Sequence, residues 1–436
     1  MLNKQYTFKS QIIVVLSAFI LSAFVIYSIY AFSFSAAHKL GFSFDYIIPD
    51  GSINLIWFFF LMCLTGTVFP FFLFIGWILR TKIRRECPDK LPFVSIIIPA
   101  FNEQETVSKS IECALAQDYP EFEILVVDDG SSDFTPLLID HPDVTSVSLP
   151  QNQGKANAVN LAISKAKGDL VLFSDSDSHL HPDAIKHLIG YFNNPKIAAV
   201  AGQLIVRQKR GFVALWQTIE YIFGQAIVKI AQCGSGSSIT VCPGPICIYR
   251  RDLLLSLGGF KDRTIVEDFD LTLEVIAAGY EVIYEPRALA WTSTPETFSA
   301  LGRQRTRWYR GNLQVFKVHK NLLFNTQHGA LGIFWMPYIL LIGFGGAILE
   351  ASIFLCFPFI FYFSSAPIEA SLFGLFLFVI FELITIIQYI LVLYLDRNLH
   401  LSLIIAACCM KPYQLFLTWI RLVALYREFR KEKVTW

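Results

Sequence analysis

Two long apolar stretches lie near the start of the chain. Residues 11–38 and residues 51–79 contain no Asp, Glu, Lys or Arg, and each is longer than the roughly 20 helical residues that cross about 30 Å of hydrocarbon. We therefore predict two transmembrane helices within residues 1–85. A cleavable signal peptide is the alternative for the first stretch, because lysines precede it and Ser35-Ala36-Ala37 could mimic a cleavage site. Signal cores, however, run for only about 7 to 15 residues.

Apolar character returns after about residue 320. The predicted apolar segments are residues 331–362, 371–395 and 401–426. Lys411-Pro412 could split the last segment into a re-entrant or interfacial hairpin, so we predict four to six spans in the chain and a C-terminal transmembrane bundle at residues 329–436. Glu350 and Glu382 fall inside this bundle, where each is either a pathway residue or a carboxylate that lies near the interface or is paired inside the bundle.

The positions of the cations predict the orientation. They flank the first two predicted spans on their outer ends, at Lys4, Lys9, Arg80, Lys82, Arg84 and Arg85, whereas the loop between the spans has only Lys39. Because short cytoplasmic segments are enriched in Lys and Arg, the segment after residue 85 is predicted to face the cytosol. We thus expect an integral, multi-pass protein of the plasma (inner) membrane, surrounded by membrane lipids.

The segment between the apolar regions alternates short β-branched runs with amphipathic stretches. The predicted strands are Phe93 to Pro99, Glu123 to Asp128, Thr145 to Leu149, Asp169 to Asp175 and Ala198 to Gln203. The predicted helices are Glu105 to Gln117, Gly154 to Lys167 and His181 to Phe192. This alternation is typical of parallel βα units and predicts one α/β domain at residues 86–295, followed by amphipathic interface helices at residues 296–328.

Composition supports lipid contact. Hydrophobic residues make up 54% of the 436 residues and charged residues 16%, with a mean hydropathy of +0.50, whereas soluble domains carry roughly 25% charged residues. The net charge of +1 gives no reason to expect a nucleic-acid partner. The nine cysteines include no CxxC pair, so we interpret them as small buried hydrophobes and expect neither a disulfide framework nor a zinc site.

Polar residues follow two of the predicted strands. The first strand ends in Pro99-Ala100-Phe101-Asn102-Glu103 and the second in Asp128-Asp129-Gly130-Ser131-Ser132-Asp133. Ligands of such sheets bind beyond the carboxyl ends of the strands, where carboxylates can accept hydrogen bonds from a base or a ribose. The alternative is that Asn102 or Asp133 caps the next helix.

Two carboxylates follow the fourth predicted strand. Asp175 and Asp177 lie two residues apart, a spacing that suits a divalent cation, Mg²⁺ or Mn²⁺, shared with a diphosphate; a solvated acidic loop is the alternative. His179 is either a further ligand or a surface histidine. Lys155 follows Gly154 at a predicted helix start, where it could reach a phosphate or serve as an ordinary first-turn lysine.

Two further clusters lie closer to the C-terminal apolar region. Glu267 and Asp268 begin a helical stretch. A carboxylate there is either a catalytic base or a first-turn charge that interacts with the helix dipole. Gln304, Arg307 and Trp308 lie on a helix that leads back to the membrane, where they present a cation and a flat aromatic face. The alternative for this helix is a juxtamembrane basic amphipathic segment, because Arg303, Arg305 and Arg310 lie in the same stretch.

Taken in order, the motifs VDDGSSD, SDSDS, VED and QRTRW resemble the signature of the membrane-integrated family 2 glycosyltransferases, the processive β-polysaccharide synthases. The segments VEDFDLTLEV, YEPRALAW and PETFSALGRQRTRW look most like the bacterial poly-β-1,6-N-acetylglucosamine synthases. CPGPICIYRR is closer to the hyaluronan and chitooligosaccharide synthases. The resemblance implies a Rossmann-like GT-A domain at the cytosolic membrane face, inserted between transmembrane helices.

The resemblance also implies roles for single residues. Asp129, adjoining Asp128, would hold the uridine together with the turn from Pro99 through Asn102 to Glu103, while Asp175 and Asp177 bind Mg²⁺ or Mn²⁺ and the diphosphate. Asp268, beside Glu267, would be the catalytic base. Lys155 would face the departing diphosphate, and Gln304, Arg307 and Trp308 would clamp the pyrophosphate and the acceptor sugar.

The implied reaction is the inverting transfer of a sugar, best matched by N-acetylglucosamine, from a UDP-sugar to a growing β-linked polysaccharide. The resemblance also implies that this transfer is coupled to export of the product and that a small membrane subunit can be a partner. Tyr309-Arg310-Gly311 departs from the Ala-Gln-Gly of poly-N-acetylglucosamine synthases, which leaves the sugar and processivity open. The alternatives are a non-processive transferase that adds one sugar to a lipid-linked acceptor, and a non-catalytic transport or scaffold subunit.

Overall fold

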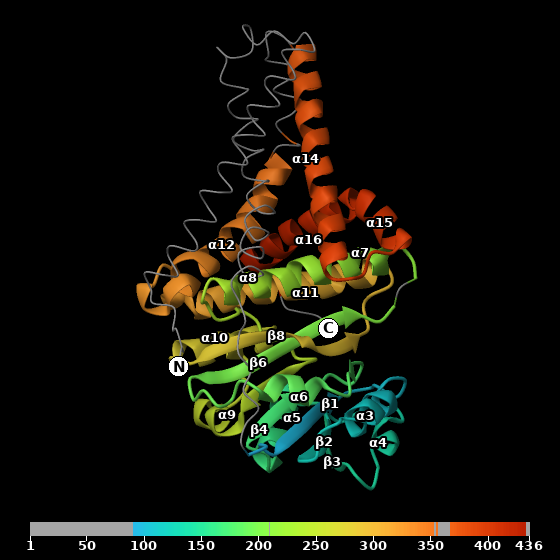
Figure 1. Ribbon diagram of the computed structural model, residues 1–436, viewed down its shortest axis with the longest axis vertical. Coiled ribbons are helices and arrows are strands. Elements are labelled where there is room, and N and C mark those ends of the chain that lie inside the picture. Colours follow the sequence, from blue (N-terminus) through green and yellow to red (C-terminus); the bar gives the residue numbers. More distant parts are fainter. Residues whose placement is uncertain (1–89, 209, 353–354, 356–366, 433–436) are drawn as a thin grey trace.

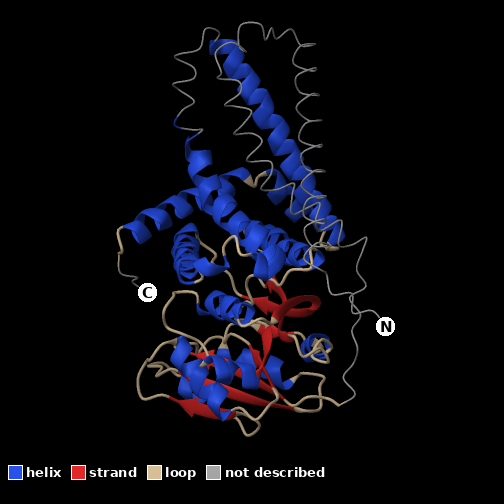
Figure 2. Cartoon of the chain, turned by 90° about the vertical axis from the view of Figure 1, so that its left-hand side faces the viewer, coloured by secondary structure: helices blue, strands red, loops and turns tan. Residues whose placement is uncertain are grey.

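The computed structural model describes residues 90–208, 210–352, 355 and 367–432. The two predicted N-terminal transmembrane helices lie outside these residues. The described part has a β-sheet domain at one end, a middle layer of helices, and long apolar helices that extend away from the sheet (Figures 1 and 2). The first five predicted strands and the three predicted helices are all present, with ends that differ by a few residues.

Eight strands form one mixed sheet. They are β1 (Val94–Ala100), β2 (Phe122–Asp128), β3 (Thr145–Ser148), β4 (Leu170–Phe173), β5 (His179–Leu180), β6 (Ile197–Val206), β7 (Cys247–Arg250) and β8 (Glu281–Thr292), in the order β3-β2-β1-β4-β7-β6-β8-β5. The first four strands of this order are parallel, as predicted. The prediction of parallel units alone is wrong beyond them, because β7 pairs antiparallel with both β4 and β6.

Helices cover both faces of the sheet because the strands are apolar on both sides. Ile96 and Ile98 of β1 pack with α3 (Val107–Leu115) and α6 (Ala184–Ile189), and Ile97 packs with α5 (Lys155–Lys165) and α10 (Glu267–Ala277). Two shorter helices, α4 (Thr135–Leu138) and α9 (Arg251–Leu257), follow β2 and β7. A strand buried on both faces reads as a continuous apolar run, which is why β1 was predictable.

The middle layer separates the sheet from the apolar helices (Figure 1). It consists of α7 (Phe212–Glu220), a π-helical turn (Tyr221–Ile227), α8 (Val228–Gly234) and α11 (Phe298–Val318). The helix α11 is an unbroken run of 21 residues whose first turn is capped by the Thr297 hydroxyl, which accepts from the amide of Ala300. It occupies most of the predicted interface segment, followed by short 3₁₀ turns at Lys320–Leu322 and Thr326–His328.

Two helical segments are long and apolar enough to cross a membrane, Leu331–Ser352, which contains α12 (Met336–Leu340), and Phe378–Leu395, the second half of α14 (Pro367–Leu395). The pair α15 (Leu401–Cys408) and α16 (Lys411–Phe429), bent by 58°, forms a third apolar unit. The predicted split at Lys411-Pro412 is thereby confirmed.

Two half-buried carboxylates of the apolar region share one cation. Lys411 Nζ lies 3.5 Å from Glu350 Oε1 and 3.1 Å from Glu382 Oε1. The hydroxyl of Thr418 donates a further hydrogen bond to Glu350 at 2.6 Å. Of the two readings of these carboxylates, the geometry favours pairing within the bundle, because a shared lysine compensates the cost of placing charge there.

Candidate active site

The loops after β1 and β2 lie side by side at the carboxyl edge of the sheet. The strands are in parallel register, with Ala100 opposite Asp128. Asn102 donates its amide to the Ser131 hydroxyl at 2.8 Å and accepts from the Ser132 amide at 2.9 Å. Asn102 therefore joins the two loops and caps no helix, whereas Asp133 accepts from the amide of Thr135 at the start of α4.

The Asp128 and Asp129 carboxylates are almost completely buried. Asp128 accepts from the amide of Ser131 at 3.1 Å, which closes its own turn. Asp129 accepts from the amides of Gln153 and Gly154 at 2.7 and 2.9 Å. Because Gly154 immediately precedes α5, Asp129 fixes the loop that leads to Lys155.

The turn residues Pro99 and Glu103 lie on either side of Asn102. Pro99 lines the same pocket as Lys155 and Asp175. Glu103 accepts from the hydroxyl of Thr106 at 2.5 Å and donates its amide to the Thr135 hydroxyl at 2.8 Å. The turn is thus held by internal hydrogen bonds and leaves Pro99 facing the pocket.

Lys155 lies next to the first carboxylate that follows β4. Lys155 Nζ lies 2.7 Å from Asp175 Oδ1 and 3.7 Å from Glu267 Oε1. Burial opposes its charge, but Asp175 and Glu267 together raise the pKa of Lys155 above its usual value. Burial and the nearby Asp175 carboxylate raise the pKa of Asp177 to about 6.

Two further carboxylates, at the start of α10, reach this edge of the sheet. Glu267 and Asp268 are the first two residues of the helix, and both line the pocket that contains Lys155 and Asp175. Burial and the charge of Glu267 raise the pKa of Asp268 to about 6, while Lys155 counteracts the shift. A carboxylate with a raised pKa beside a cation in a pocket is typical of general bases.

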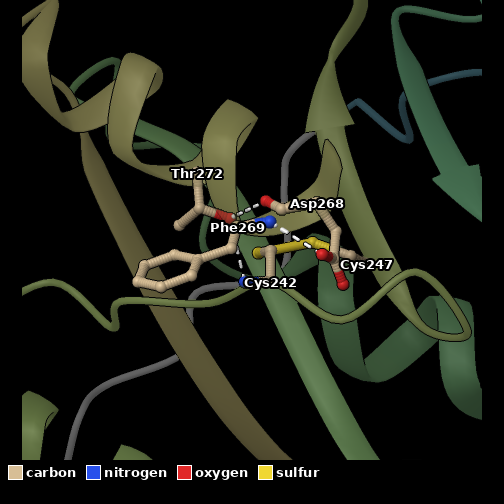
Figure 3. Close-up of a disulfide and its surroundings, with 5 residues drawn as sticks. All are labelled: Cys242, Cys247, Asp268, Phe269 and Thr272. Carbon is tan, nitrogen blue, oxygen red and sulfur yellow. Dashed lines mark hydrogen bonds between the residues drawn. A yellow bond between two sulfur atoms is a disulfide. The ribbon is translucent and has the colours of Figure 1, made fainter. Parts of the chain in front are cut away.

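A disulfide between Cys242 and Cys247 lies against α10, which corrects the expectation that no disulfide forms (Figure 3). The amide of Cys242 donates to the Thr272 hydroxyl at 2.9 Å, and that hydroxyl donates to the carbonyl of Asp268 at 2.7 Å. The spacing of five residues matches no common cysteine motif, and only the fold of the intervening Pro-Gly-Pro loop brings the two Cα atoms to 5.8 Å.

The loop closed by this disulfide forms one wall of the site. A Cβ atom at Gly244 would lie 3.3 Å from Lys155 Nζ and 3.4 Å from Asp175 Oδ1. The backbone at Gly244 therefore runs close to both charged groups, and an added Cβ would fit tightly against Lys155 Nζ. Sequence reasoning missed Gly244 and the two cysteines as site residues, although CPGPIC carried the signal in its Pro-Gly-Pro turn.

Gln304, Arg307 and Trp308 lie together on α11, with Arg307 exposed and the other two half-buried. One turn further on, a Cβ atom at Gly311 would come within 2.6 Å of Val266 Cγ2, so α11 passes directly beside the start of α10. Arg305 and Arg310 are buried. The reading of this helix as a basic membrane-surface segment is therefore wrong for these two arginines.

The donor set fits a divalent cation only in part. Asp175 and Asp177 supply two carboxylates, which is the number that Mg²⁺ commonly takes from protein when phosphate oxygens complete its shell. Across the described residues, no group of three or more His, Cys, Asp or Glu side chains is arranged to hold a metal ion. His179 is not part of such a group, since its Nε2 lies 2.8 Å from Nη1 of Arg207.

Comparisons with known proteins indicate the enzyme family of the sheet domain. Residues 95–258 match the model of glycosyl transferase family 2. The poly-β-1,6-N-acetyl-D-glucosamine synthase of Staphylococcus epidermidis is 29% identical over 374 residues, covering 82% of this chain and 86% of that protein. The synthase of the same name from Staphylococcus aureus is 33% identical over 232 residues, covering 52% and 56%.

A solved structure shares the fold. The mannosyltransferase PcManGT from Pyrobaculum calidifontis, in complex with GDP-Man and Mn²⁺, superposes with a TM-score of 0.60 at 18% identity, over 86% of this chain and 100% of that one. This likeness concerns the fold and confirms the predicted GT-A architecture. The family match and the similar synthases identify residues 95–258 as a glycosyl transferase family 2 domain, which makes the chain a glycosyltransferase.

Proposed function

We propose that the chain transfers N-acetylglucosamine from a UDP-sugar to a growing β-linked polysaccharide, with inversion at the anomeric carbon. The observation that carries the proposal is the meeting of Lys155, Asp175 and Asp268 in one pocket, beside the helix that presents Trp308. The similar staphylococcal proteins named as poly-β-1,6-N-acetyl-D-glucosamine synthases support this choice of sugar and polymer.

The proposed reaction needs a base, a site for the leaving group and an acceptor platform. Asp268 accepts the proton of the acceptor hydroxyl as that oxygen attacks the anomeric carbon, a step where general base catalysis contributes roughly 10²- to 10⁴-fold. Lys155 and Arg307 face the charge that develops on the departing diphosphate. Trp308 offers a flat apolar surface for the acceptor ring.

Asp175 and Asp177 would hold a divalent cation, which when bound neutralises charge on the diphosphate. In this proposal Asp128 and Asp129 keep the β2 loop and the Lys155 loop in register, while Asn102 joins the β1 and β2 loops next to them. The uridine lies along Pro99 to Glu103. These loops select the nucleotide, and the acceptor side selects the sugar chain.

The apolar helices support a membrane location for this chemistry. Residues 331–352 and 378–395 are long and apolar enough to span it, and α11 connects the site to them. We propose that the product leaves between these helices, with a small membrane subunit as a possible partner of the complex. The proposed orientation puts the sheet domain on the cytosolic side, where nucleotide sugars are supplied.

The testing experiment measures UDP release and product length from the purified chain in lipid vesicles with Mg²⁺. UDP-N-acetylglucosamine, UDP-glucose and UDP-glucuronate are supplied separately. A long polymer from UDP-N-acetylglucosamine alone is the expected result. Transfer of a single sugar to an added lipid acceptor would show a non-processive transferase in place of a polymerase. No turnover with any donor would contradict the proposed donor class.

A further inference from the structure

A fully buried arginine lies beneath the proposed acceptor platform. Arg305 has no exposed surface, although it stands in a helix with the exposed cations Arg303 and Arg307. Burying a guanidinium is costly unless it is paired and hydrogen-bonded. The contacts of Arg305 therefore indicate what its burial achieves.

The first contact is an ion pair that links two helices of the middle layer. Arg305 Nη2 donates to Glu220 Oε2 at 2.7 Å, from α11 to the last residue of α7. The same Glu220 oxygen accepts from the hydroxyl of Tyr413, which is fully buried on α16. Arg305 also donates to the Gln304 side chain. Three helices thus hold the guanidinium in one position.

The second contact is with the ring of Trp308. The Arg305 guanidinium carbon lies 4.1 Å from the centroid of that ring, well inside the roughly 6 Å over which a cation and an aromatic face attract. A planar guanidinium stacks on an aromatic face, which an ammonium group does not do in the same way. Arg305 therefore fixes one face of the half-buried Trp308.

The third contact is with the buried ring of Tyr221. Tyr221, the first residue of the π-helical turn, lies with its ring centroid 6.0 Å from the Arg305 guanidinium carbon. Burial, and among smaller effects the charge of Asp177, raise the pKa of Tyr221 to about 12. Arg305 therefore lies against two aromatic rings, those of Trp308 and Tyr221.

We propose that Arg305 is a positioning residue for the acceptor: the Glu220–Arg305 pair, braced by Tyr413, fixes the ring plane of Trp308 against which the acceptor sugar binds. This inference rests on the proposed function, because it assumes that Trp308 binds an acceptor. It assigns Arg305 no contact with the reacting atoms. Its loss therefore affects the binding of the acceptor more than the binding of the donor.

The test uses the full chain in lipid vesicles, with UDP-N-acetylglucosamine as the donor and a short β-1,6-linked N-acetylglucosamine oligosaccharide as the acceptor. Arg305→Lys keeps the charge that pairs with Glu220 but removes the planar stacking group. Tyr413→Phe removes only the hydroxyl that holds Glu220. Arg303→Lys, on the exposed side of the same helix, is the matched control. KM is measured for the donor and the acceptor separately, together with the melting temperature.

In Arg305→Lys we expect the acceptor KM to rise about 3- to 30-fold, the effect of losing the planar stacking of the guanidinium on the ring, while the donor KM stays within a factor of two. Tyr413→Phe raises the acceptor KM by a smaller factor, and Arg303→Lys changes neither constant.

An unchanged acceptor KM in Arg305→Lys and Tyr413→Phe, with an active wild type, overturns the positioning role alone. A wild type that transfers no sugar overturns both this inference and the proposed function. If Arg305→Lys fails to fold, the result for Tyr413→Phe decides.

Discussion

Lys155 Nζ lies 2.7 Å from Asp175 Oδ1, and this contact joins the start of α5 to the loop after β4. The same ammonium lies 3.7 Å from Glu267, the first residue of α10. One cation thus lies between a carboxylate of the proposed metal pair and a carboxylate beside the proposed base. The positions of these three groups depend on one another.

Replacing Lys155 tests this arrangement. Lys155→Met leaves Asp175 and Glu267 without their cation and removes a positive charge from the diphosphate site. We expect UDP to bind about tenfold more weakly, because a charged hydrogen bond contributes about 1.5 to 3 kcal/mol. Calorimetric titration with UDP and Mg²⁺ measures the change, and Lys165→Met, exposed at the end of the same helix, is the control. Equal UDP affinities in both variants would contradict the assignment.

The raised pKa of Asp268 predicts an acid limit to catalysis. A base must be deprotonated to accept a proton, and a pKa of about 6 means that Asp268 is protonated, and turnover lost, as the pH falls below this value. In Glu267→Gln, one cause of the raised pKa is absent, so the limit moves to lower pH by about 0.5. The pH profile of kcat is the measurement. Asp252→Asn, exposed on α9, is the control, and a profile that stays unchanged in Glu267→Gln would count against the base assignment.

Removal of divalent cations tests the acidic pair. We expect EDTA to abolish sugar transfer and Mg²⁺ or Mn²⁺ to restore it. Asp175→Asn and Asp177→Asn each lower the metal affinity by about tenfold or more, since each removes one of two carboxylate ligands. Metal titration of UDP release gives these affinities. Asp143→Asn, a well-exposed carboxylate, serves for comparison, and full activity in EDTA would exclude the metal role.

The disulfide predicts a link between the CPGPIC loop and donor affinity. In Cys242→Ser with Cys247→Ser, the wall formed by Gly244 next to Lys155 and Asp175 loses a constraint. We expect the donor KM to rise about 2- to 10-fold with little loss of fold, because an unrestrained loop must be ordered on binding. Steady-state kinetics measure this effect. Cys408→Ser, an exposed free thiol, is the control, and a dithiol reductant should reproduce the effect in the wild type but not in the double variant.

The close approach of Gly311 and Val266 predicts a steric effect that a second substitution repairs. Gly311→Ala places a methyl group within about 2.6 Å of Val266 Cγ2, which pushes α11 away from the start of α10. We expect kcat to fall about tenfold or more, because the base and the acceptor platform lie on these two helices. Gly311→Ala with Val266→Ala should recover most of the lost kcat. No recovery in the double variant would show that the spacing of the two helices is not the cause.

The sequence allowed prediction of the parallel half of the sheet but not the rest. A strand such as β1, Val94–Ala100, can be predicted because burial on both faces makes it a nearly continuous apolar run in the sequence. The four residues of β7 carry no such signal, and their antiparallel pairing with β4 depends on a long excursion of the chain through the middle helices. The two residues of β5 are too few for any periodic pattern.

The candidate site follows the same distinction. Asp129, Asp175 and Asp268 could be singled out because acidic residues that follow strands or open helices gather at one edge of such a sheet. The burial of Arg305 could not be predicted, because Arg303 and Arg307 are the same residue type on the same helix and yet remain exposed. Its pairing depends on Glu220, which is 85 residues away in sequence. Long-range contacts of this kind need the tertiary structure.

The unbroken helix α11 has a mechanical consequence. Its 21 residues form a rod of about 30 Å. The rod lies against the start of α10 at Gly311 and is paired with α16, where Arg310 and Lys317 lie 3.3 and 3.1 Å from Glu428. We therefore expect a tilt of the apolar helices to be passed along this rod to the ring of Trp308. At the proposed membrane location, a bilayer thinner than the apolar helices are long would make these helices tilt or kink, so we expect the lipid environment to influence where the acceptor ring lies.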